Sequence, residues 1–70
     1  MPRYFFHLED GERVPDRLGQ ELRDDSAALR LAAEVGVALR RRRGRIWRVV
    51  VTNEWGYEVT EIPVTLEPEG

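Results

Sequence analysis

The chain has 70 residues, a net charge of −2 from 11 basic and 13 acidic side chains, one histidine and no cysteine. Without cysteine it cannot form disulfides or thiolate metal sites, and one histidine is too few for the zinc sites that combine Cys and His. The slight acidic excess argues against a protein built mainly to hold nucleic acid.

The chain is long enough for one domain, which we expect to span residues 1–70 with a flexible tail at 67–70. Because a domain of this size buries only about 60% of its unfolded surface, self-association is the expected source of further stability. No apolar run approaches the roughly 18–20 residues of a membrane span, and the polar N-terminus does not resemble a signal peptide. We therefore expect a cytoplasmic protein with no membrane contact.

The first segment, Arg3–Glu9, is rich in aromatic residues and predicts a strand. It ends in Asp10-Gly11, a pair typical of tight hairpin turns, so Glu12–Pro15 is expected to be the return strand. This strand is short, and its proline cannot donate a ladder hydrogen bond, which indicates an edge. A linking segment follows at Pro15–Leu22.

Residues from Asp24 to Arg43 contain no proline, are rich in Ala, Leu and Arg, and predict the only helix. Asp24 and the residues after it suit an N-terminal cap, and Gly44 suits the position just past the last turn. At 100° per residue the segment has one broad apolar face, formed by Ala28, Leu29, Ala32, Val35, Gly36 and Leu39.

The second hairpin follows the helix. Arg45–Asn53 has the strongest strand pattern in the chain, and Asn53–Gly56 predicts a hairpin loop closed by a glycine with positive φ. Tyr57–Leu66 is the expected last strand. Its alternation slips near Pro63, which predicts a bulge or a strand end there.

The pattern therefore predicts an α+β domain of order ββαββ, in which one helix packs on a four-stranded antiparallel sheet. If the two strands that carry proline take the edges, the sheet order is 2-1-3-4. The helix then forms a right-handed crossover from the second strand to the third.

Alternation along the strands sorts the side chains onto two faces. We expect the helix to cover one set, Tyr4, Phe6, Leu8, Trp47, Val49, Val51 and Val59. The opposite face then carries three large apolar side chains, although an uncovered antiparallel face is normally polar. We predict a homodimer through this face or an edge strand, with an interface of Phe5, His7, Ile46, Arg48 and Val50. Alternatively, the segment from Arg17 to Arg23 folds over it.

Several motifs together resemble a family of small bacterial proteins that is classed as a domain of unknown function. They are Pro2-Arg3-Tyr4-Phe5-Phe6-His7, Asp10-Gly11, then Asp16, Gly19, Glu21, Leu22 and Asp24, the Ala-rich helix, Trp47-Arg48-Val49 and Gly56. The resemblance covers nearly the whole chain, implies a bacterial cytoplasmic protein and supplies no catalytic position. The hairpin, acidic segment and helix are also similar, at the level of fold alone, to HicB-type antitoxins, which neutralise a small RNA-cleaving toxin.

His7 is the only candidate for a general base near neutral pH, and Glu9 is its only acidic neighbour on the same strand face. A lone strand histidine more often packs or hydrogen-bonds than catalyses. Glu9, Asp10 and Glu12 could bind a hard cation, but turn chemistry explains these acids without one. We therefore predict no catalytic residue, no metal site and no cofactor.

The arginine-rich end of the helix supports an alternative function. Cationic groups around an aromatic ring, here Trp47, suit phosphates and stacked bases. Cations at a helix C-terminus are also favoured by the helix dipole, which explains them without a ligand. The side chains concerned are Arg40, Arg41, Arg42, Arg43, Arg45 and Arg48.

The leading prediction is a small non-enzymatic interaction module, homodimeric, which regulates or buffers an unknown protein partner as an antitoxin does. The alternative is an RNA- or DNA-contacting protein that uses the arginine cluster. An enzyme ranks third, because glycine-rich phosphate loops, catalytic triads and nucleotide-binding fingerprints are all absent from the sequence.

Overall fold

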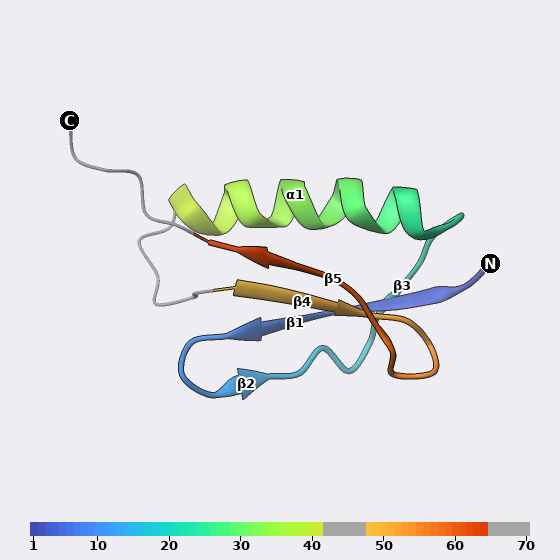
Figure 1. Ribbon diagram of the computed structural model, residues 1–70, viewed down its shortest axis with the longest axis horizontal. Helices are drawn as coiled ribbons and strands as arrows, with labels where there is room; N and C mark the ends of the chain where they lie inside the picture. Colours follow the sequence, from blue (N-terminus) through green and yellow to red (C-terminus); the bar gives the residue numbers. More distant parts are fainter. Residues whose placement is uncertain (42–47, 65–70) are drawn as a thin grey trace.

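The computed structural model describes residues 1–41 and 48–64, except for the side chains of Arg40 and Arg41. One helix packs on an antiparallel sheet, and runs along its β5 side (Figure 1). The elements in chain order are β1 (Arg3–Glu9), β2 (Arg13–Val14), β3 (Gln20–Glu21), α1 (Asp25–Arg41), β4 (Arg48–Thr52) and β5 (Glu58–Pro63). In the described residues, no helix is long and apolar enough to cross a membrane.

The sheet has the order β2-β1-β4-β5, and β3 pairs with β1 beside this path. The predicted α+β class, with one helix on an antiparallel sheet, is confirmed. The predicted count of four strands is wrong, because Gln20 and Glu21 pair with Tyr4 and Arg3. Leu22 N–H also donates to the Pro2 carbonyl, which continues this pairing by one residue.

The two short strands lie along the same edge of β1. β2 pairs with the end of β1 at Leu8 and Glu9, and β3 pairs with its beginning. Between them the chain leaves the strand path for residues 15–19, which we call the connector. Gly19, at φ 69°, directs the chain back into β3.

The helix begins as its sequence predicts. Asp24 Oδ1 accepts the N–H of Ala27 at 3.0 Å, so Asp24 caps the first turn and α1 starts one residue later. A Cβ on Gly36 would lie 3.1 Å from Ile62 Cγ2, so α1 approaches β5 closely at this glycine. Leu29, predicted on the apolar face, is exposed because it lies at the margin of that face. The predicted helix end at Arg43 lies outside the described residues.

The core lies between α1 and the sheet. Tyr4, Val49 and Val51 are buried against Ala28 and Ala32. The half-buried side chains around them include Phe6, Leu8, Leu22, Val35, Leu39, Val59 and Ile62. The described members of the predicted helix-facing set are all found here, whereas Trp47 lies outside the described residues.

The second hairpin departs from prediction in the place of its register shift and in the length of β5. The register shifts between Val51 and Thr52, opposite Val59, and not near Pro63. β5 does end at Pro63, as predicted. The shift lets Val59 point to the core while Glu58 pairs with Thr52. β5 is shorter than its predicted range, and the predicted start of β4 at Arg45 lies outside the described residues.

Candidate functional site

Two regions of the domain gather polar or exposed aromatic side chains. The first is the end of the molecule where β1 and α1 begin and the β4–β5 hairpin turns (Figure 1). A cleft of about 510 Å³ opens there, lined by Pro2, Tyr4, residues 23–26, Asn53 and Trp55. We call this cleft, together with Glu54 and Tyr57 of the same hairpin loop, the end surface.

The loop on the end surface is held by its first residue. Asn53 Oδ1 accepts the N–H groups of both Trp55, at 2.9 Å, and Tyr57, at 3.0 Å. The Asn53 N–H donates to the Tyr57 carbonyl, and Gly56, at φ 85°, donates its N–H to the Asn53 carbonyl. These bonds fix the loop backbone, yet the side chains of Trp55 and Tyr57 are 73% and 71% exposed.

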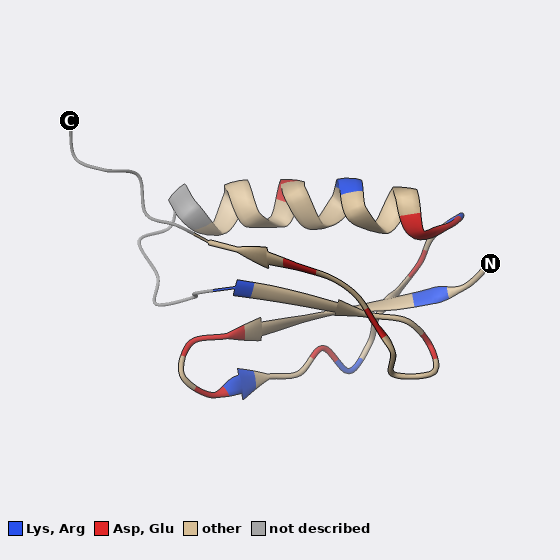
Figure 2. Ribbon diagram, viewed as in Figure 1, with Lys and Arg blue, Asp and Glu red and all other residues tan. Residues whose placement is uncertain are grey.

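Negative charge surrounds the cleft. The Tyr4 hydroxyl donates to Asp25 Oδ1 at 2.6 Å. This bond, burial of the ring and the nearby carboxylates of Asp25, Asp24 and Glu54 raise the pKa of Tyr4 to about 12, so the phenol is neutral at physiological pH. Figure 2 shows acidic residues at the start of α1 and in the β4–β5 loop. Arg23 also lines the cleft, which leaves an excess of negative charge.

The second region is the sheet face that points away from α1, which we call the open face. His7 lies in its middle, with the Phe5 ring nearly parallel to the imidazole at a centroid distance of 6.3 Å. His7 Nε2 lies 2.9 Å from Thr52 Oγ1, and His7 Nδ1 accepts the N–H of Asp16 at 3.0 Å. Both ring nitrogens therefore have hydrogen-bond partners within the chain.

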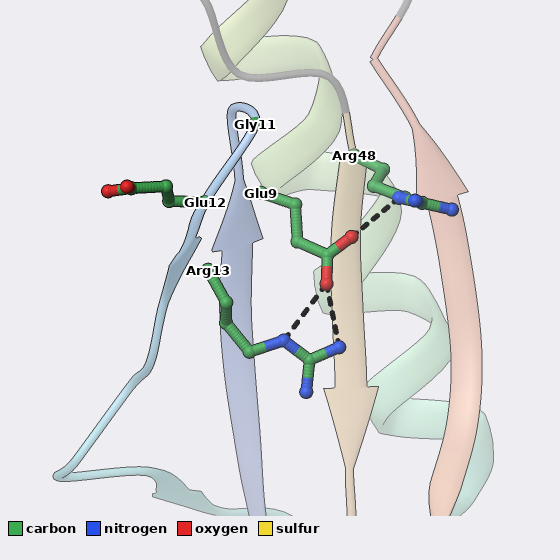
Figure 3. A pocket seen from close by; sticks show the side chains of 5 residues that line it. All are labelled: Glu9, Gly11, Glu12, Arg13 and Arg48. Atoms are coloured by element: carbon green, nitrogen blue, oxygen red, sulfur yellow. Dashed lines mark hydrogen bonds and ion pairs between the residues drawn. The ribbon is translucent and has the colours of Figure 1, made fainter.

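Ion pairs cross all four strands of the sheet path on the open face. Figure 3 shows the pairs that Glu9 forms with Arg13 and Arg48. Glu9 Oε2 accepts from Arg13 Nε and Nη2 at 2.9 and 2.7 Å, and Glu9 Oε1 lies 2.6 Å from Arg48 Nε. Arg48 Nη1 in turn donates to Glu61 Oε1 at 2.9 Å. The pKa of Glu9 lies below its usual value, mainly because its carboxylate accepts hydrogen bonds from Arg13.

The predicted acidic cluster thus divides into separate roles. Glu9 is bound by two guanidinium groups, and the Asp10 carboxylate accepts the N–H of Glu12 at 3.3 Å within the turn. Over residues 1–41 and 48–64, no group of three histidine or acidic side chains is placed to hold a metal ion. A small cleft of about 150 Å³ lies beside Glu9, Glu12 and Arg13, and the ion pairs of Glu9 line it.

Comparison with known proteins identifies the family. A family model for a domain of unknown function, DUF6894, matches the sequence over residues 3–65, which is nearly the whole chain. The chain belongs to the DUF6894 family. This confirms the predicted membership of a family of unknown function. No curated protein and no solved structure matches this DUF6894 domain, so neither search supports the predicted likeness to HicB-type antitoxins.

The structure brings four of the five residues of the predicted dimer interface onto one face of the sheet. Phe5, His7, Arg48 and Val50 share the open face, whereas Ile46 lies outside the described residues. Val50 is only 3% exposed in the single chain, and Phe5 and His7 are half-buried. Phe5 is partly covered by the connector, since a Cβ on Gly19 would lie 2.8 Å from its ring. The face therefore offers less apolar surface than the strand pattern predicts.

The arginine cluster of the DUF6894 domain falls mostly outside the structure. Arg42, Arg43 and Arg45 are not described, and only the backbone is described at Arg40 and Arg41. Arg48 is the exception, and Glu9 and Glu61 both compensate its charge. The structure thus gives the nucleic-acid alternative no available cation at this position.

Trp55 and Tyr57 were not among the predicted site residues of the DUF6894 domain. The sequence does contain a signal, because two aromatic residues flank the glycine of a tight loop that begins with asparagine. Loop side chains have no strand parity, so their exposure cannot be read from alternation.

Proposed function

We propose that this DUF6894 domain is a small non-enzymatic interaction module that docks a protein partner on its end surface. The single observation that carries the proposal is the pair of exposed aromatic side chains, Trp55 and Tyr57, on a loop fixed by Asn53. Tryptophan and tyrosine dominate binding energy at protein interfaces. A prearranged loop also loses little conformational freedom when it binds.

The charge of the end surface selects the kind of partner. Asp24, Asp25 and Glu54 lie near the cleft, and Trp55 offers an exposed ring face beside them. An arginine or lysine side chain can interact with both the carboxylates and the ring. We therefore assign the occupant as an exposed segment of another protein that combines apolar side chains with a cation. A second copy of this chain fits poorly, because its own carboxylates would face those of the first copy.

Displayed random peptides provide a defined set of probes for this proposal. Selection on the full chain should enrich peptides that carry arginine or lysine next to apolar residues. The dissociation constant of an enriched synthetic peptide is then measured for the full chain, for Trp55→Ala and for a matched control, Val37→Ala. Val37 is an exposed apolar residue of α1 outside the end surface.

Trp55→Ala should weaken binding by at least about tenfold, equal to about 1.4 kcal/mol, while Val37→Ala leaves it unchanged. Equal binding by all three proteins would contradict the proposed surface. Regulation of the partner in an antitoxin-like manner would follow if docking covers the partner's own functional site, and an activity assay of the identified partner tests this step.

Self-association through the open face stays a separate proposal. Its support is the shared placement of Phe5, His7 and Arg48 on that face, and its weakness is that Val50 is already covered. Sedimentation up to high micromolar concentration decides it. A mass near twice the 8.2 kDa of one chain that falls on Phe5→Ser substitution supports the homodimer, whereas a monomer mass throughout excludes it.

A further inference from the structure

The connector closes a gap in the edge of β1. The strand pairs Leu8↔Val14 and Tyr4↔Gln20 bracket it, so no strand of the described residues pairs with the middle of β1 on this edge. One carboxylate takes the place of the missing strand. Asp16 Oδ2 accepts the N–H of Phe6 at 3.1 Å, and Asp16 Oδ1 accepts the N–H groups of Leu18 and Gly19 at 3.0 and 3.1 Å.

The second attachment of the connector depends on the protonation state of His7. The Asp16 backbone N–H can only donate, so His7 Nδ1, 3.0 Å away, must carry a lone pair. The imidazole is therefore neutral, with its proton on Nε2, which donates to Thr52 Oγ1 at 2.9 Å. This arrangement of donors and acceptors fits one protonation state of the ring.

We propose that protonation of His7 releases the connector from β1 and uncovers the backbone N–H of Phe6, so that the domain contains an acid-sensitive latch. A proton on Nδ1 points at the Asp16 N–H, and two donors cannot share a hydrogen bond. Release also removes Gly19 from the Phe5 ring. The Phe6 N–H, which Asp16 holds in the closed state, then becomes open to solvent.

The charges around His7 set the pH at which the latch opens. Burial, the main cause, and the Arg13 guanidinium on β2 hold the pKa of His7 below 6.5, although Asp16 and Glu9 act in the opposite direction. From β4 the ring faces Thr52, while Arg48 on that strand is paired with Glu9. The latch is therefore closed at neutral pH and opens only in acid.

Asp16 itself is not the trigger. Burial opposes ionisation of its carboxyl, but the backbone N–H groups of Gly19, Phe6 and Leu18 outweigh burial and hold the pKa of Asp16 below its usual value. The carboxylate therefore stays charged while His7 titrates.

Nuclear magnetic resonance of the full chain between pH 8 and pH 4 tests the latch. The ring nitrogen shifts should show the Nε2–H tautomer of His7 at high pH. Protection of the Phe6, Asp16 and Gly19 amides against hydrogen exchange, corrected for intrinsic rates, should fall at least about tenfold as His7 becomes protonated. Protection at Val49 and Val51 in the centre of the sheet should persist.

His7→Asn is the matched control, because its side-chain oxygen can accept the Asp16 N–H near the position of Nδ1 and does not titrate. Its Asp16 amide should stay protected over the whole range. Three results would overturn the proposal. They are an Nδ1–H tautomer of His7 at high pH, amide protection that does not change as His7 titrates, and a simultaneous loss of amide protection at Val49 and Val51. The wild-type series decides alone if the variant does not fold.

Discussion

The hydroxyl of Tyr4 donates a 2.6 Å hydrogen bond to the carboxylate of Asp25, which ties the first strand to the first turn of the helix. These residues are 21 positions apart, and their bond forms one wall of the cleft on the end surface. Because Asp24 caps the same turn, strand and helix meet in a fixed geometry. The cleft is thus shaped by contacts that also hold the fold together.

A titration of tyrosine absorbance tests this bond. In a Tyr57→Phe variant, Tyr4 is the only tyrosine, and it should ionise near pH 12. Since the folded pKa is raised above the usual value of 10.0 for tyrosine, the stability from this bond is complete below pH 10 and is lost as the pH rises towards 12. Ionisation near pH 10 in the folded chain would show that the bond does not form.

Two glycines with positive φ provide a matched comparison. Gly56→Ala should cost about 1–2 kcal/mol, because alanine rarely adopts the positive φ of this position. No steric cost is added, since nothing lies within 4 Å of the new Cβ. Gly19→Ala should destabilise the domain by clearly more, since its Cβ would lie 2.8 Å from Phe5 Cε2 and 2.9 Å from Arg3 Cγ. Urea unfolding measures both. Equal losses would show that the connector does not pack on Phe5 as described.

Asn53 controls the order of the aromatic loop. Asn53→Ala removes the acceptor of the Trp55 and Tyr57 N–H groups, so hydrogen exchange of both amides should accelerate and peptide binding should weaken several-fold. Asn53→Asp keeps a side-chain oxygen at this position and should retain both properties. If binding survives Asn53→Ala unchanged, the prearranged loop is not the source of affinity.

The lowered pKa of His7 predicts how stability depends on pH. Between 6.5 and the folded pKa, the unfolded chain binds more protons than the folded one, so stability should fall as the pH decreases through this window. Above 6.5 the contribution is complete. Urea unfolding at a series of pH values should show a smaller slope for His7→Asn in this window, and identical slopes would speak against a neutral His7 in the folded state.

Local sequence patterns were sufficient to predict the main elements. The aromatic run before Asp10-Gly11 forms β1, and the spacing of Ala28 and Ala32 places α1 on the sheet. Strand β3 could not be predicted, because Gln20 and Glu21 have no preference for strands. Their pairing depends on the turn at Gly19 and on distant partners in β1.

The candidate sites were harder to predict for related reasons. Alternation correctly places His7 and Val50 on the open face, but it does not show that Val50 is covered within one chain. The partner of His7 Nδ1 is a backbone group in the connector, which no side-chain motif reveals. The exposure of Trp55 follows from loop geometry and not from strand parity.

Amide chemical shifts of the full chain, recorded during titration with a selected basic peptide, give the most direct test of the proposed docking surface. The largest changes should fall at residues 53–57 and at 23–26 around the start of α1. Changes confined to the open face, around His7 and Arg48, would contradict docking on the end surface.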